Sequence, residues 1–252
     1  MARSIFKTGR LDAIIVENRE EHVPLPPSDI GLSLRRLFSH HFEKREASES
    51  QHFGNPTLPD VPTLLVERDE LNGEKVQKWI QQFQPDLLIS YGVHLLGEDV
   101  LKVPRRASWN IHGGLSPWYR GVITHFWPSY FLEPQFTGMT VHETTAAVDG
   151  GAIIHQTRAA LNPGDGIHDL SCKAVLSLTT EITSLLQGFH DGKEIVAKPQ
   201  TTTGRIWRSI DWRPEHLRHI YDLFDDSIVD MYLSGEFTQR EPKLVRQDLE
   251  GE

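Results

Sequence analysis

Apolar runs of strand length alternate with segments of helical periodicity along the first half of the chain. A run rich in β-branched residues predicts a buried strand at 11–16, and further short runs predict strands at 64–66, 87–90 and 107–112. Apolar positions at helical spacing predict helices over 30–49 and 76–83. This alternation predicts an α/β fold with a mainly parallel central sheet and helices on both faces.

The second half of the chain continues the same alternation. A strand is predicted over 137–148, an Asp-Gly-Gly turn at 149–151, and a further strand over 152–156. A helix is predicted over 167–185, and a last one from about 214 to 234.

These elements predict one α/β domain over residues 1–199 and an extension over 200–252 that carries one amphipathic helix. The helix at 30–49 is interpreted as an insertion. A doubly wound domain usually opens with a strand followed by a glycine-rich phosphate loop, but no Gly-x-Gly pattern follows the strand at 11–16. The sequence therefore predicts that the usual first βα unit is absent from this chain.

Composition narrows the class of protein. A chain of 252 residues can bury a sizeable core, and its single cysteine, Cys172, excludes a disulfide scaffold and favours a cytoplasmic location. The formal charge of −9 disfavours a nucleic-acid partner. We expect no membrane span, because no run of about 18 apolar residues is present. We therefore expect an enzyme or a binding domain.

Candidate chemistry begins at the end of the strand over 107–112. Asn110 and His112 are two residues apart, so both side chains point to one face of the strand. An amide beside an imidazole can stabilise an oxyanion and move a proton. Asp149 in the later turn could orient the imidazole, although an Asp-Gly turn also reads as a plain hairpin.

Other histidines and the cysteine carry less information. The spacing of Cys and His does not fit zinc, so we expect no metal. His142 is interpreted as a packed histidine, and Cys172 as inert because it lies near the apolar face of its helix.

Three segments together carry a resemblance to a known family. They are Asn110-Ile-His112 with Pro117 and Arg120-Gly121, then residues 137–142, then residues 149–156. In order and spacing they resemble the 10-formyltetrahydrofolate-dependent formyltransferases, over roughly residues 64–189. That family includes glycinamide ribonucleotide, methionyl-tRNA and amino-sugar N-formyltransferases.

The resemblance implies a Rossmann-like formyltransferase fold and the catalytic residues Asn110, His112 and Asp149. It implies 10-formyltetrahydrofolate as the donor co-substrate and a small-molecule amine as the acceptor. The implied donor-binding residues lie in two loops: Tyr91, Gly92, Val93, His94 and Leu96, opposite Ala146 and Val148. Tyr119, Arg120 and His125 are the candidate contacts to the acceptor.

The acceptor predicted from the sequence is a nucleotide-linked amino sugar. The phosphate loop of the glycinamide ribonucleotide enzymes is not recognisable, and residues 200–252 hold 7 Lys+Arg against 11 Asp+Glu, the wrong balance for binding tRNA. Those two acceptors and an inactive scaffold of the same fold remain the alternatives. A homodimer also stays open, because the apolar stripe of the last helix could cover either this subunit's own sheet or that of a partner.

Overall fold

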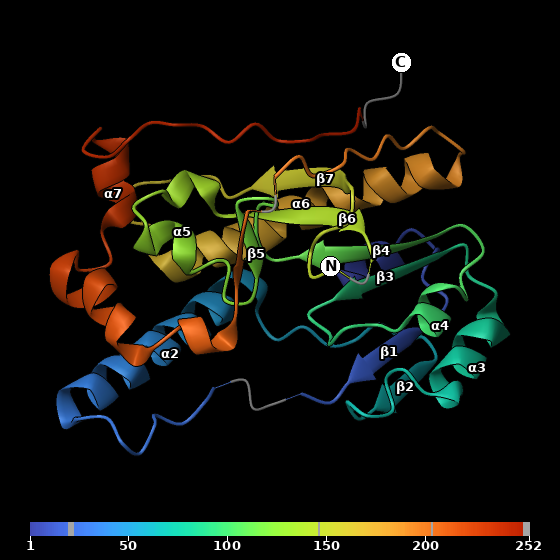
Figure 1. The fold of residues 1–252 in the computed structure, drawn as a ribbon, viewed down its shortest axis with the longest axis horizontal. Coiled ribbons are helices and arrows are strands. Elements are labelled where there is room, and N and C mark those ends of the chain that lie inside the picture. Colours follow the sequence, from blue (N-terminus) through green and yellow to red (C-terminus); the bar gives the residue numbers. More distant parts are fainter. Residues whose placement is uncertain (20–22, 146, 203, 249–252) are drawn as a thin grey trace.

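A four-stranded mixed sheet forms the centre of the computed structural model, which describes residues 1–19, 23–145, 147–202 and 204–248 (Figure 1). Its strands, in spatial order, are β3 (Leu87–Tyr91), β4 (Ala107–His112), β6 (Gly138–Glu143) and β7 (Ile153–Arg158). β3 and β4 are parallel, but β4 with β6 and β6 with β7 are antiparallel. The α/β class is confirmed, but the expected mainly parallel sheet is wrong. The segment after β4 returns β6 antiparallel to β4, and the turn at 149–151 joins β6 and β7 as a hairpin.

Two small parallel sheets flank the central one. β1 (Ile14–Glu17) pairs with β2 (Thr63–Val66). β5 (Tyr119–Gly121) pairs with β8 (Arg205–Trp207), so a strand of the C-terminal extension is built onto the chain segment that follows β4.

The three predicted helices of the first 199 residues are present. The helix predicted over 30–49 is α2 (Leu32–Phe53), the next is α3 (Glu74–Phe83), and the long helix is α6 (Ile167–His190). Short helical segments complete this part: α1 (Ala2–Phe6), α4 (Glu98–Leu101), α5 (Trp127–Tyr130) and the 3₁₀ turn η1 (Pro134–Phe136). No helix among the described residues is both long and apolar enough to cross a membrane.

Helices lie on both faces of the central sheet, as predicted. Side chains alternate along β3, so Leu87 and Ile89 pack in the cluster formed with α6, while Leu88 packs in the cluster formed with α3. On β4, Trp109 and Ile111 join the α6 cluster. Asn110 and His112 therefore point to the opposite face.

The predicted helix over 214–234 is wrong as one element. The chain forms the 3₁₀ turns η2 (Ser209–Asp211) and η3 (Pro214–His216), the π-helix η4 (His219–Leu223) and the short helix α7 (Ile228–Leu233). Asp225 and Asp226 interrupt it with φ of 48° and 56°. Asp226 is held there by Lys44, whose Nζ lies 2.9 Å from Oδ2, and by the Ile167 N–H, 3.0 Å from Oδ1. These tertiary contacts outweigh the helical periodicity.

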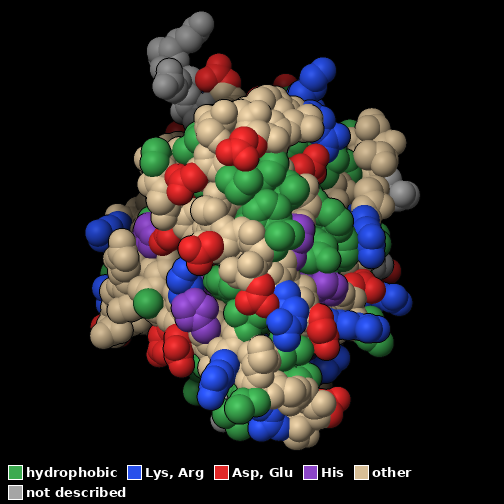
Figure 2. All heavy atoms as spheres, turned by 90° about the vertical axis from the view of Figure 1, so that its left-hand side faces the viewer, with side chains coloured by type: hydrophobic (Ala, Val, Ile, Leu, Met, Phe, Trp, Pro, Cys, Tyr) green, Lys and Arg blue, Asp and Glu red, His purple; other side chains and the backbone are tan. Residues whose placement is uncertain are grey.

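The extension is nevertheless part of the core. Trp207, Leu217 and Ile220 pack with Phe126 and Trp127 of the segment after β4. Figure 2 views the end of the molecule where α2 and α7 lie, and acidic, basic and apolar side chains are intermixed on this face.

Candidate active site

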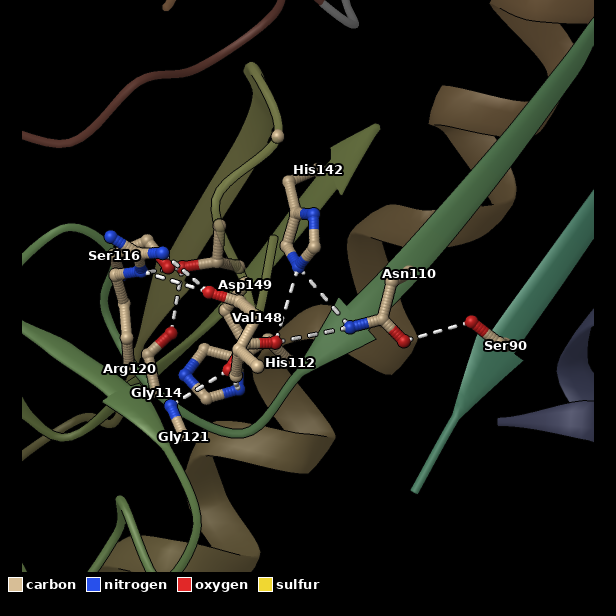
Figure 3. A network of polar contacts seen from close by, with 12 residues as sticks. Ser90, Asn110, His112, Gly114, Ser116, Arg120, Gly121, His142, Val148 and Asp149 are labelled. Atoms are coloured by element: carbon tan, nitrogen blue, oxygen red, sulfur yellow. Dashed lines mark hydrogen bonds and ion pairs between the residues drawn. The ribbon is translucent and has the colours of Figure 1, made fainter. Parts of the chain in front are cut away.

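The polar face of β4 lines up with polar residues of both neighbouring strands. Asn110 is in register with Ser90 on β3 and with His142 on β6. The Ser90 hydroxyl donates to Asn110 Oδ1 over 2.8 Å, and Asn110 Nδ2 lies 3.1 Å from His142 Nε2 (Figure 3). The site is thus assembled across three adjacent strands.

Asp149 reaches this face from the turn between β6 and β7. Its φ is 44°, a conformation that Asp tolerates better than most residues. The Gly121 N–H donates to Oδ2 over 2.7 Å, and the same oxygen lies 3.4 Å from His112 Nδ1. The other oxygen lies 3.4 Å from both His142 Nε2 and Asn110 Nδ2. The carboxylate therefore contacts the side chains of Asn110, His112 and His142 at once (Figure 3).

The hydrogen bonds fix the orientation of the Asn110 amide. His142 Nδ1 lies 2.7 Å from the Glu143 carbonyl and must donate to it, which leaves Nε2 as an acceptor for one Asn110 N–H. The second N–H faces Asp149 over 3.4 Å, longer than an ordinary hydrogen bond. That weakly held N–H is the donor that a substrate oxygen can use.

The same reasoning assigns the tautomer of His112. Nε2 donates to the Tyr119 carbonyl over 2.7 Å, so Nδ1 of the neutral ring carries the lone pair and faces Asp149. Burial lowers the pKa of His112, while the Asp149 carboxylate and the Tyr119 carbonyl act in the opposite direction. A buried neutral imidazole beside a carboxylate can accept a proton at Nδ1.

Asp149 itself stays ionised. Burial alone would raise the pKa of its carboxyl, but the neighbouring imidazoles of His142 and His112 and the Gly121 N–H outweigh it, so the pKa lies below its ordinary value. The site therefore keeps a negative charge that stabilises a protonated His112.

Glycines allow the close packing around this group. A Cβ at Gly114 would lie 2.6 Å from His112 Nε2, and one at Gly151 would lie 1.8 Å from the Glu143 carbonyl oxygen. Gln200, the first residue of the extension, donates through Nε2 to the carbonyls of Asp149 and Gly151 over 2.7 and 2.9 Å. The turn that carries Asp149 is thus held by a distant part of the sequence.

The loop predicted to bind the donor begins directly after β3. Tyr91 and Gly92 are exposed, with φ of 65° at Gly92, whereas Val93 and Leu96 pack into the α3 cluster. His94 is half-buried and bound to Glu17. Because Ser90 contacts Asn110, this loop starts beside the candidate catalytic group.

The other predicted residues have internal partners. Ala146 lies outside the described residues, and Val148, 36% exposed, accepts from Arg120 Nε over 3.1 Å. The buried Tyr119 donates its hydroxyl to Glu133 over 2.9 Å. His125 Nε2 donates to the Gly138 carbonyl over 3.1 Å, and burial lowers the pKa of its imidazole to about 4. Their contacts to an acceptor stay predictions.

Sequence reasoning missed three residues of the group: Ser90, His142 and Gln200. The alternating pattern over 137–148 was the available signal for His142, since it places that side chain on the same face as Thr140. Its contact with Asn110 depends on the antiparallel register of β4 and β6, which no local pattern specifies. Among the described residues, no cluster of three or more His, Cys, Asp or Glu side chains is suited to hold a metal ion.

The fold is α/β, and on one face of its central sheet an amide N–H and a buried imidazole nitrogen each lie 3.4 Å from the carboxylate of Asp149. Residues 26–179, more than half of the chain, match the family described as formyl transferase. The chain belongs to the formyl transferase family.

Individual relatives agree with this assignment. A segment of 84 residues is 37% identical to the bifunctional polymyxin resistance protein ArnA of Wigglesworthia glossinidia brevipalpis. The match covers 33% of this chain and 13% of that protein, so this chain corresponds to a small part of ArnA.

Solved structures show the same fold at low identity. The formyltransferase PseJ from Anoxybacillus kamchatkensis, in complex with UDP-4,6-dideoxy-4-formamido-L-AltNAc and tetrahydrofolate, has a TM-score of 0.54 at 18% identity. That match covers 86% of this chain and 95% of PseJ. Phosphoribosylglycinamide formyltransferase from Anaplasma phagocytophilum has a TM-score of 0.51 at 14% identity, covering 78% and 97%.

Proposed function

We propose that this enzyme transfers the formyl group of 10-formyltetrahydrofolate to the amino group of a nucleotide-linked amino sugar. The observation that carries the proposal is the convergence of Asn110, His112 and Asp149 on one face of the sheet, at hydrogen-bond or ion-pair distance. A weakly held amide N–H and a proton acceptor are two groups that suit formyl transfer to an amine.

The residues beside this group suit a flat, partly apolar donor. The exposed Tyr91 and Leu95 lie on the loop after β3, and a Cβ at Gly92 would meet no atom within 4 Å, so the backbone there is open to close approach. When bound, the folate supplies an electrophilic formyl carbon and a nitrogen that leaves with a proton.

The protein residues then have distinct tasks. The Asn110 N–H that faces Asp149 turns to the formyl oxygen and stabilises the negative charge that develops on it as the amine nitrogen attacks. His112 accepts the proton of the amine at Nδ1, because Nε2 is already bound to the Tyr119 carbonyl. Asp149 stabilises the resulting imidazolium over 3.4 Å and allows His112 to return the proton to the leaving nitrogen.

The charge of the extension argues against a tRNA acceptor, and the fold is shared with an enzyme whose structure holds a nucleotide-linked sugar. The extension is acidic, with 7 Lys+Arg against 11 Asp+Glu over residues 200–252, which disfavours a polyanion such as tRNA. PseJ, whose structure carries a formylated UDP-sugar, matches over 95% of its length.

The direct test incubates the whole chain with 10-formyltetrahydrofolate and a panel of UDP- and dTDP-linked amino sugars, glycinamide ribonucleotide and methionyl-tRNA, and identifies formylated products by mass spectrometry. We expect an amino sugar to give the highest kcat/KM. His112→Ala should lower it by about 10²–10⁴-fold, and His40→Ala, at an exposed histidine on α2, should leave it unchanged. Formylation of another acceptor would replace the amino-sugar proposal, and no transfer to any acceptor would favour the scaffold.

A further inference from the structure

A buried carboxylate at the end of β1 binds one residue of the loop after β3 through both of its oxygens. Glu17 is the last residue of β1, and its side chain is fully shielded from solvent. Oε2 accepts from the His94 backbone N–H over 2.9 Å, and Oε1 accepts from His94 Nδ1 over 2.5 Å. The contact fixes both the main chain and the ring of His94.

Such an arrangement is costly unless it is well paired. An ionised carboxylate loses its hydration on burial and is stable only where hydrogen bonds replace the water. Hydrogen bonds to a charged acceptor are also stronger than neutral ones. Glu17 therefore fixes His94 by directional hydrogen bonds, whereas the neighbouring Val93 and Leu96 are held by apolar packing.

Two further side chains hold the same loop, which we define as the donor loop, residues 91–97. Arg19 Nη1 donates to the Gly92 carbonyl over 2.7 Å. Asn72, between β2 and α3, donates to the Leu95 carbonyl over 2.9 Å and accepts from the Gly97 N–H over 2.6 Å. The loop is thus held from outside at Gly92, His94, Leu95 and Gly97, by residues of β1 and of the segments that follow β1 and β2.

The opposite end of the loop leads into the catalytic group. Ser90, the residue before the loop, donates to Asn110 over 2.8 Å. A loop held by Glu17 and joined to Asn110 presents its exposed residues Tyr91 and Leu95 in a fixed position relative to the reacting centre. Such preorganisation improves ligand binding by reducing the ordering that binding requires.

We infer that Glu17 is a positioning residue for the formyl donor, acting through His94 to hold the donor loop in the shape that binds the folate ring system. The inference rests on the proposed function. It assigns Glu17 to donor affinity and not to the chemical step, since both oxygens of its carboxylate are bound to the donor loop.

The test compares Glu17→Gln with Glu181→Gln. Glu181 on α6 forms a similar pair with a buried histidine of β7, its Oε2 lying 2.8 Å from Nε2 of His155, away from the donor loop. For each variant, calorimetry gives the Kd of 5-formyltetrahydrofolate, and steady-state kinetics give kcat and the two KM values.

Glu17→Gln should raise the Kd and the donor KM at least tenfold, with kcat at saturating donor and the acceptor KM within twofold of the unchanged protein. Glu181→Gln should leave all four within twofold, and a double variant with His94→Ala should bind the donor no more weakly than Glu17→Gln alone.

Normal donor affinity in Glu17→Gln would overturn the inference, as would equal losses in both Glu→Gln variants. If Glu17→Gln does not fold, Asn72→Ala, at an exposed residue, takes its place: a raised donor KM with unchanged kcat supports a held loop, and a normal KM contradicts it. If the unchanged protein itself fails to bind 5-formyltetrahydrofolate, the proposed function fails, which distinguishes that result from a failure of the role of Glu17.

Discussion

Asp149 connects the two residues that face the reaction. It lies 3.4 Å from His112 Nδ1 through one oxygen and 3.4 Å from Asn110 Nδ2 through the other. Its charge opposes the effect of burial on His112 and so keeps the pKa of that imidazole from falling further. The loss of this one carboxylate should therefore change both the rate and its pH dependence.

Asp149→Asn should lower kcat by about 10²-fold or more and move the acid limb of kcat/KM to lower pH. His112 accepts a proton only when neutral, so activity is lost as the pH falls through its pKa. Burial places that pKa below the ordinary value of about 6.5, and removal of the neighbouring negative charge lowers it again. The measurement is a pH profile of both proteins, and an acid limb that moves upward in the variant would contradict this role.

His142 should act by fixing the Asn110 amide. His142→Phe removes the acceptor of one Asn110 N–H, so we expect kcat to fall about tenfold, while the Kd of 5-formyltetrahydrofolate stays within twofold. His142→Gln, whose side-chain oxygen can accept the same N–H, should recover much of the rate. Equal kcat values for the Phe and Gln variants would argue that His142 serves packing alone.

The residue scale also shows what the sequence could predict. Asn110 and His112 were identified because period-two spacing at a strand end is a local property. The roles of Ser90 and His142 depend on which residues face Asn110 across the sheet, and Gln200 reaches the Asp149 turn from 51 residues away. Such contacts follow from register and tertiary packing, which local spacing does not determine.

At the scale of elements, the pairing of β5 with β8 supports the site from behind. The Gly121 N–H holds Asp149, while the Val122 N–H donates to the Trp207 carbonyl over 2.9 Å. At Gly121 φ is 94°, and a Cβ would lie 2.0 Å from the Trp207 carbonyl oxygen. This close approach leaves no room for a side chain.

A non-glycine residue in a left-handed backbone conformation costs about 1–2 kcal/mol of stability, and Gly121→Ala should cost more than this because its Cβ has no room. It should also lower kcat, because Asp149 loses its N–H partner. Gly192→Ala is the matched control, since φ there is 76° but a Cβ meets no atom within 4 Å. Urea unfolding and kinetics of both variants check this. Similar losses of stability, with normal kcat in both, would show that the β5–β8 contact does not support the site.

Local sequence patterns predicted the central strands and the long helices, except where tertiary contacts break the last helix. The strand at 107–112 was predicted with its observed limits. In the last predicted helix Leu217, Ile220 and Ile228 are buried, although the helix that was expected to carry them is not continuous. The break at Asp225 and Asp226 follows from contacts with α2 and the start of α6, which a local pattern does not contain.

At the scale of the whole molecule, buried neutral histidines link stability to pH. His41 on α2 lies 2.9 Å from the Tyr221 hydroxyl and 3.2 Å from His168 on α6. Burial, followed by the charge of His168, lowers the pKa of His41 to about 2, and burial, followed by the charge of Arg45, lowers that of His168 to about 4. Both rings are thus neutral in the folded protein at pH values where they are protonated in the unfolded chain.

The free energy of unfolding should accordingly fall as the pH drops from about 6.5 toward 4, by up to about 1.4 kcal/mol per pH unit for each histidine. The sign follows because the unfolded state binds more protons in this range, so stability rises with pH and levels off above about 6.5. Urea unfolding across this range should give a shallower slope for His41→Phe than for His40→Phe at the neighbouring exposed histidine. Equal slopes would contradict the account.

The class of fold was predictable from the rhythm of strands and helices, but the direction of the strands was not. The Asp-Gly-Gly turn was predicted between two strands and does join β6 and β7 as a hairpin, but the expected sheet did not include this reversal or the antiparallel pairing of β6 with β4. That reversal brings Asp149 back over β4, so the antiparallel part of the sheet is also what completes the site.

The central claim is that this chain binds a formylated folate beside Asn110, His112 and Asp149. Its most direct test is calorimetry and thermal unfolding of the whole chain with 5-formyltetrahydrofolate, a stable isomer of the donor. We predict saturable binding and, at a hundredfold excess over the Kd, about 2.7 kcal/mol of added stability. The absence of both binding and stabilisation in a well-folded sample would contradict the claim.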